Sequence, residues 1–181
     1  FTPVNKSRAD SLERFGPLFS SGLRRLVEEG AVSTTANSRH ACTETGPGHS
    51  VLLSGRSPRS SGIVANQWYD QEADLLVDAA ADDAHPLLAV SPDAVPGPGR
   101  SSQRLLAPGI ADALAAGTDH RGRTVTVSVK DRSAIFVAGQ ASALPLWLDP
   151  SQPAVTTSDL YASSLPAWLG DQYSQPVWPG I

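Results

Sequence analysis

The chain has 181 residues, which is enough for one domain with a sizeable core. Its apolar fraction of 40% and charged fraction of 18% are typical of a folded globular protein and argue against a disordered one. The net charge of −4 gives no electrostatic basis for binding nucleic acid, and no apolar run reaches the roughly 18 residues that a membrane span needs. Cys42 is the only cysteine, which excludes an intrachain disulfide.

The first third of the chain predicts helices. Apolar residues recur at helical spacing from Leu12 to Val27, and we expect Pro17 to divide this stretch and Gly30 to end it. A short strand over 31–36 is expected next. A turn then leads into a helix with Thr45 at or just before its N-cap, Pro47 in its first turn and Gly55 at its end.

The rest of the chain predicts alternating helices and strands. This alternation favours α/β layers with a largely parallel sheet. We expect residues 79–102, which are rich in Ala, Asp, Pro and Gly, to form a surface excursion. The other expected elements are a loop over 55–62, a short apolar element over 62–70, a helix over 105–116, a strand over 124–129 with its valines on one buried face, a strand over 144–148 and a short helix over 165–169.

Thr45 is a candidate nucleophile. The free N–H groups and the dipole of a helix N-terminus favour an alkoxide and an incoming phosphate, and a bound metal would activate the hydroxyl further. The competing interpretation is that Thr45 only caps its helix.

Lys130, Arg132 and Asn66 are candidate phosphate ligands. Lys130 and Arg132 follow the strand over 124–129 at its carboxyl end, where open α/β sheets bind ligands, and in an extended chain they point the same way. An arginine can grip two phosphate oxygens while a lysine supplies a point charge, and the amide of Asn66 can donate without adding charge. The alternatives are a solvated Lys-Asp-Arg turn that partly neutralises itself and an ordinary turn asparagine.

Two other patterns are weaker. Gly48-His49-Ser50 matches half of the serine-hydrolase elbow G-x-S-x-G, but Leu52 stands where the final glycine belongs. The four histidines, His40, His49, His85 and His120, show no metal-ligand spacing.

Taken together, four segments resemble the alkaline phosphatase superfamily, and within it the zinc-dependent monoesterase branch with a threonine nucleophile. Their order and spacing agree with that branch, and a Lys-x-Arg pair distinguishes it from related nucleotide pyrophosphatase/phosphodiesterases. The resemblance implies a three-layer α/β/α fold, of which residues 1–181 would form a single partial domain. The four segments are 45–50, 53–58, 62–70 and 129–135, and the tail over 165–168 also fits.

The resemblance also implies a role for each candidate. Thr45 would attack phosphorus in line, form a covalent phospho-threonine and serve as a ligand to one of two zinc ions. Asn66, Lys130 and Arg132 would bind the non-bridging oxygens of a small-molecule phosphate monoester and stabilise charge in the transition state. A periplasmic or secreted location is implied as well.

The other zinc ligands of the superfamily are an Asp upstream of the threonine and Asp and His residues far downstream. We expect the chain to be an internal fragment that lacks them and is inactive by itself. The alternative functions are a phosphodiesterase or nucleotide pyrophosphatase of the same superfamily, and an inactive phosphate- or protein-binding remnant.

Overall fold

The computed structural model describes residues 14–31, 33, 37–140, 143–152 and 154–169. They belong to two compact units, Phe1–Thr43 and Glu44–Ile181. No helix in the described part of the chain has the length and apolar character needed to cross a membrane. The expected strand over 31–36 falls mostly outside the described residues.

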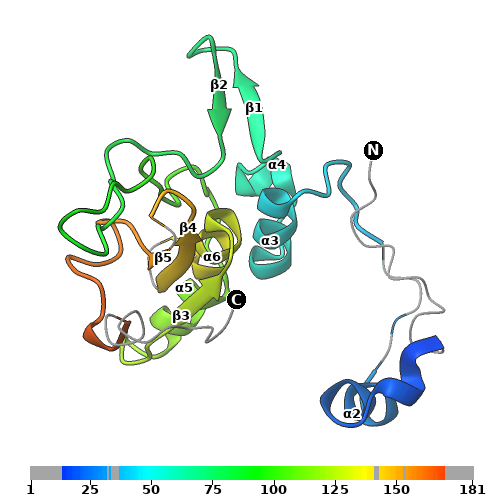
Figure 1. Cartoon of the computed structure of the whole chain (residues 1–181). Helices are drawn as coiled ribbons and strands as arrows, with labels where there is room; N and C mark the ends of the chain where they lie inside the picture. Colours follow the sequence, from blue (N-terminus) through cyan, green and yellow to red (C-terminus); the bar gives the residue numbers. More distant parts are fainter. Residues whose placement is uncertain (1–13, 32, 34–36, 141–142, 153, 170–181) are drawn as a thin grey trace. The chain divides into compact units, whose positions relative to one another are not determined.

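The first unit is helical, as predicted (Figure 1). A 3-10 helix, η1 (Gly16–Leu18), starts with Pro17 in its first turn, and α2 (Gly22–Glu29) follows. Gly30 ends α2 as expected. Two ion pairs one turn apart support this helix, Arg24 with Glu28 and Arg25 with Glu29, each at 2.8 Å.

The second unit contains a three-stranded sheet of order β3-β4-β5, formed by β3 (Val125–Ser128), β4 (Leu144–Asp149) and β5 (Ala154–Thr156). β3 and β4 are parallel, with Val125 opposite Leu144, and β5 is antiparallel to β4. The helix α6 (Asp131–Ala138) connects β3 to β4 and packs on both, and such a crossover helix is the usual connection between parallel strands. A mostly parallel sheet was expected; this sheet has one parallel and one antiparallel pair.

Two more helices pack against α6, namely α3 (Thr45–Ser54) and α5 (Ile110–Gly117) (Figure 1). The expected loop over 55–62 contains a short helix, α4 (Pro58–Ser61), because proline is favourable at its first position and Gly62 adopts a positive φ at its end. The expected helix over 105–116 begins five residues late because Pro108 and Gly109 interrupt it. Residues 167–169 are helical, within the range predicted for the last helix.

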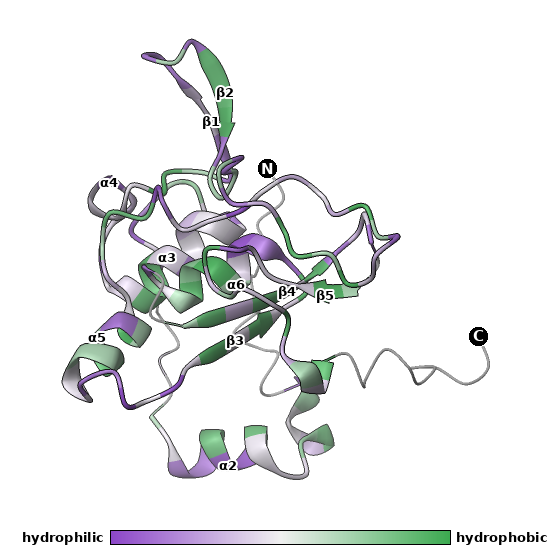
Figure 2. Ribbon diagram, turned by 90° about the vertical axis from the view of Figure 1, so that its left-hand side faces the viewer, coloured by the Kyte–Doolittle hydropathy of each residue, from purple (hydrophilic) through white to green (hydrophobic). Residues whose placement is uncertain are grey.

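The strands β1 (Gln67–Asp70) and β2 (Leu75–Asp78) form an antiparallel hairpin that projects from the second unit (Figures 1 and 2). Gln67 pairs with Asp78 at the base of the hairpin. The base is the important part for the candidate site, because Asn66 directly precedes β1 and Asp78 ends β2 there.

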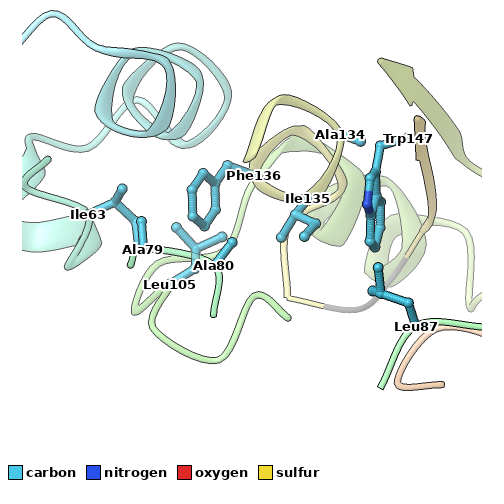
Figure 3. Packing of buried hydrophobic residues seen from close by; sticks show 9 residues of the cluster. All are labelled: Ile63, Ala79, Ala80, Leu87, Leu105, Ala134, Ile135, Phe136 and Trp147. Atoms are coloured by element: carbon cyan, nitrogen blue, oxygen red, sulfur yellow. The ribbon is translucent and has the colours of Figure 1, made fainter. Parts of the chain in front are cut away.

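The main core lies between α6 and its neighbours. Figure 3 shows Phe136 of α6 lying toward Ile63 and Ala79, and Trp147 of β4 lying over Leu87. Residues 79–102, expected as a surface excursion, form no helix or strand, and they contribute Ala79, Ala80 and Leu87 to this core. The complete cluster is Ile63, Ala79, Ala80, Leu87, Leu105, Ala134, Ile135, Phe136 and Trp147.

The expectation that the valines of β3 are buried is wrong. Val125 and Val127 are 50% and 70% exposed, and the polar Thr126 faces the helix instead, with its Oγ1 donating to the carbonyl of Ala134 at 2.8 Å. Alternation identified the strand correctly but did not identify which face α6 covers.

Candidate functional site

Thr45 is the first residue of α3, and Glu44 is the N-cap. The predicted helix start is therefore confirmed to within one residue, and Gly55 ends the helix with φ +66° as expected. Thr45 is half-buried, and its carbonyl accepts a hydrogen bond from Nδ1 of His49 at 2.8 Å. Since a carbonyl only accepts, this bond fixes the proton of His49 on Nδ1 and gives the residue a structural role one turn into the helix.

Asn66 is bound to the start of α3 by two hydrogen bonds. Its side-chain Oδ1 accepts from the backbone N–H of Gly46 at 2.7 Å, and its own backbone N–H donates to the carboxylate of Glu44 at 2.6 Å. Because the Gly46 N–H can only donate, the amide oxygen is the atom that faces it, and the NH₂ end of Asn66 is directed elsewhere. This orientation is what a donor to a phosphate oxygen requires.

Gly46 makes this contact possible through its lack of a side chain. A Cβ at this position would lie 3.1 Å from Oδ1 of Asn66 and 3.3 Å from a methyl group of Ile63. The amide of Asn66 can therefore approach the first turn of α3 closely only while residue 46 is glycine.

The sequence predicts that Lys130 and Arg132 lie in one extended segment, but in the structure they do not. Lys130 is the N-cap of α6, with φ −111° and ψ 139°, and Asp131 already begins the helix. Lys130 is exposed, whereas the side chain of Arg132 is only 20% exposed. The two cations therefore differ in burial, since the side chain of Lys130 is exposed to solvent and that of Arg132 is largely buried.

The guanidinium of Arg132 is held by a carboxylate that sequence analysis did not identify. Its Nη2 donates to Asp78 at the end of β2, and its Nη1 lies 3.7 Å from Asp131. Its Nε is buried and has no hydrogen-bond partner among the described residues. A buried guanidinium N–H without a partner indicates a place for an acceptor.

A second missed residue is Arg100, whose Nε donates to Asp131 at 2.6 Å. The side chains of Arg100 and Asp131 are 18% and 16% exposed, so this ion pair is largely protected from solvent. Local sequence gave no signal for it, because Arg100 lies in an irregular Pro- and Gly-rich segment 31 residues before its partner.

Arg100, Lys130, Asp131 and Arg132 line one cavity of about 300 Å³. The other lining residues are mainly apolar and include Leu87 and Trp147 of the core, along with Asp149. The lining carries three cations and two carboxylates, and a third carboxylate, that of Asp78, pairs with Arg132 from outside the lining.

A series of contacts across the base of the hairpin links two of the four predicted site residues, Asn66 and Arg132. Gly46, next to Thr45, binds Asn66; the carbonyl of Asn66 accepts from the N–H of Ala79 at 2.9 Å; and the adjacent Asp78 binds Arg132. Lys130 and Arg132 line the cavity, whereas Thr45 and Asn66 are not part of its lining.

Within the described residues, no group of three or more His, Cys, Asp or Glu side chains is arranged to hold a metal ion. Thr45 is thus the only predicted zinc ligand in this part of the chain. His85 pairs with a single carboxylate: its Nδ1 lies 2.9 Å from Oδ1 of Asp159.

Residues 7–177 match the model of a protein family described as type I phosphodiesterase / nucleotide pyrophosphatase. The chain belongs to this family. The family is part of the alkaline phosphatase superfamily, so the predicted superfamily is confirmed.

The relatives of this family member include named alkaline phosphatases. PhoK of Sphingomonas sp is 31% identical over 175 residues, covering 95% of this chain and 30% of PhoK. PafA of Elizabethkingia meningoseptica is 29% identical over 170 residues, covering 93% of this chain and 31% of PafA. A crystal structure of wild-type PafA matches with a TM-score of 0.83 at 26% identity, covering 94% of this chain and 32% of that one. This match confirms the α/β fold, and the chain spans about a third of the length of these relatives.

A second PafA structure, with a TM-score of 0.83 and 25% identity, is of a variant changed at one threonine, one asparagine, one lysine and one arginine. In that protein the threonine and asparagine are 21 positions apart, and the lysine and arginine are two apart. Thr45 and Asn66 have the same spacing here, and so do Lys130 and Arg132.

Proposed function

We propose that this chain carries the nucleophile and the phosphate-binding groups of an enzyme that hydrolyses phosphate monoesters. The observation that carries the proposal is the contact series from Gly46 through Asn66 and Asp78 to Arg132, which joins residues distant in sequence into one arrangement. The variant named in the PafA structure, with the same four residue types at the same two spacings, supports it. Since the chain spans about a third of its relatives, this activity belongs to the whole protein.

In the proposed reaction the hydroxyl oxygen of Thr45 forms a bond to phosphorus as the bond to the ester oxygen breaks. The hydroxyl loses its proton, the departing alcohol takes one up, and a phospho-threonine remains. Water then attacks the same phosphorus from the opposite side, which releases inorganic phosphate and restores Thr45. The NH₂ of Asn66 would bind a non-bridging oxygen, because its Oδ1 already accepts the N–H of Gly46.

Zinc is implied by the superfamily, but the described residues do not fit two zinc ions, because they offer Thr45 alone. The groups that this chain does supply, from Asn66 to Lys130 and Arg132, bind and orient phosphate, and that function can be measured on the chain by itself.

The pair of cations favours a monoester over a diester. A phosphate monoester carries two negative charges near neutral pH and a diester one, so Lys130 and Arg132 are matched to the monoester. The second candidate is diester or pyrophosphate hydrolysis, which the description of the family itself favours. A diester needs a pocket for its second organic group, and the apolar part of the cavity, with Leu87 and Trp147, is one such place.

The test is calorimetric titration of the chain with inorganic phosphate and with dimethyl phosphate. We expect phosphate to bind more tightly, and Lys130→Ala to weaken phosphate binding about tenfold or more while changing dimethyl phosphate binding less. Asn66→Asp keeps an acceptor for Gly46 but places a negative charge at the site, so it should abolish phosphate binding without unfolding the chain. Arg121→Gln, at an exposed arginine that donates to the carbonyl of Thr118, is the matched control.

Equal losses for both ligands in Lys130→Ala would favour the diesterase alternative. Unchanged phosphate binding in both variants would reject the proposed site and leave an inactive binding remnant as the better description. For the whole protein, the same discrimination comes from comparing an aryl phosphate with its diester. We also propose that the whole protein is periplasmic or secreted and that its substrate is a small-molecule phosphate ester.

A further inference from the structure

The starting observation is that Asp131 lies between two arginines and is bound by one of them. Its Oδ2 accepts from Nε of Arg100 at 2.6 Å, while its Oδ1 lies 3.7 Å from Nη1 of Arg132, too far for a hydrogen bond. Oδ1 instead accepts the backbone N–H of Arg132 at 2.7 Å. The carboxylate of Asp131 is thus held in place, but not by the neighbouring guanidinium.

This arrangement leaves Arg132 with donors to spare. Of its three guanidinium nitrogens, Nη2 is bound to Asp78, Nη1 is beyond hydrogen-bond distance of Asp131, and the buried Nε has no partner in the described part of the chain. The Nε–H shares an edge of the guanidinium with Nη2, so Nε and Nη1 are two separate donors for an anion. If Asp131 moved onto Nη1, that donor would be used, and Arg132, which already pairs with Asp78, would have a second carboxylate at hydrogen-bond distance.

We propose that Arg100 is a positioning residue for the phosphate site and acts by keeping Asp131 away from Arg132. This inference rests on the proposed function. Without Arg100, the carboxylate of Asp131, which is only 16% exposed, would lose its principal partner. The nearest cation is then Arg132, and the attraction between partly buried charges at 3.7 Å is strong enough to close the gap.

The alternative is that Arg100 binds the anion directly, since it lines the same cavity as Lys130 and Arg132. The two possibilities differ when Asp131 is also removed. If Arg100 acts through Asp131, then Asp131→Asn in an Arg100→Gln background restores binding, because a neutral amide does not neutralise Arg132. If Arg100 binds the anion, the double variant stays as weak as Arg100→Gln.

The experiment measures the Kd for inorganic phosphate in the intact chain and in Arg100→Gln, Asp131→Asn and the double variant. We expect Arg100→Gln to weaken binding about tenfold and the double variant to return to within about threefold of the unmodified chain. Arg100→Lys, which keeps the cation, should stay near the unmodified value. Arg121→Gln should change nothing. A double variant as weak as Arg100→Gln overturns the inference.

A second readout does not depend on phosphate. Rotation of the Arg132 guanidinium about its Nε–Cζ bond, followed by ¹⁵N exchange NMR without ligand, should slow in Arg100→Gln as Asp131 closes on it, and should recover in the double variant. Rotation that is the same in all variants would overturn the inference. If the unmodified chain fails to bind phosphate while this rotation changes as expected, the proposed function is rejected, and what stands is that Arg100 holds Asp131 away from Arg132.

Discussion

Gly139, at the end of α6, is a position where one methyl group should have a large effect on stability. The residue has φ +80° and ψ −144°, a conformation that side chains other than glycine rarely adopt. A Cβ there would lie only 2.1 Å from Oδ2 of Asp112. That carboxylate accepts the backbone N–H of Gly109 at 2.7 Å and that of Gln140 at 3.0 Å, which connects α5 to the end of α6.

The expected cost of Gly139→Ala follows from these two effects. The backbone strain contributes about 1–3 kcal/mol. Displacing the carboxylate of Asp112 weakens two charge-assisted hydrogen bonds, at about 1.5–3 kcal/mol each when fully lost. Part of this is offset by about 0.4–1 kcal/mol, because alanine restricts the unfolded chain more than glycine does. We expect a net loss of about 3–4 kcal/mol in the free energy of unfolding.

The measurement is guanidinium chloride unfolding followed by far-UV circular dichroism, with the midpoint and slope both fitted. The matched control is Gly117→Ala at the end of α5, where a Cβ meets nothing within 4 Å, and it should leave stability unchanged or slightly increased. In an Asp112→Ala background, Gly139→Ala should cost only the strain. A loss under about 1 kcal/mol in the otherwise unmodified chain would refute the reasoning.

Two further predictions concern Tyr161 and Gly46. Burial raises the pKa of Tyr161 to about 12, so the folded chain favours the neutral phenol, and about 2–3 kcal/mol of stability should be lost as pH rises from 10 through 12. Tyr161→Phe removes the phenolic hydroxyl. The free energy of unfolding is measured at pH 9 and at pH 12 for this variant and for the unmodified chain, and the unmodified chain should lose more stability between the two. An equal loss in the two proteins would contradict the raised pKa of Tyr161. Gly46→Ala should displace Asn66 by a few tenths of an ångström and weaken phosphate binding several-fold, with a stability change within about 1 kcal/mol; unchanged affinity in a titration would contradict the proposed role of Asn66.

Local chemistry allowed the elements near the site to be predicted, because their signals are local. The start of α3 near Thr45, its end at Gly55 and the strand β4 all depend on residues within one or two turns of each other. The buried face of β3 was predicted wrongly. The packing of α6 determines which face is buried, and the alternation of Val125 and Thr126 is compatible with either face.

The roles of the four candidate site residues stay predictions. Thr45, Asn66, Lys130 and Arg132 were each as compatible with a cap or a turn as with a phosphate site, and only their shared order indicated more. Their ionic partners could not be predicted, since Asp78 and Arg100 lie 54 and 31 residues from the residues they bind. The alternative interpretation was a Lys-Asp-Arg turn that partly neutralises itself; Asp131 does lie 3.7 Å from Arg132, but its shorter ion pair, at 2.6 Å, is with Arg100.

The ion pair between Asp78 and Arg132 also determines the order in which the site can form during synthesis. The two residues are 54 positions apart, and a ribosome adds about 5–20 residues per second, so the hairpin base emerges roughly 3–11 s before Arg132 exists. During that interval Asp78 has no guanidinium to bind and α6 is not there to cover Ile63 and Ala79. The nascent chain therefore exposes the apolar residues of its future core until α6 has been made.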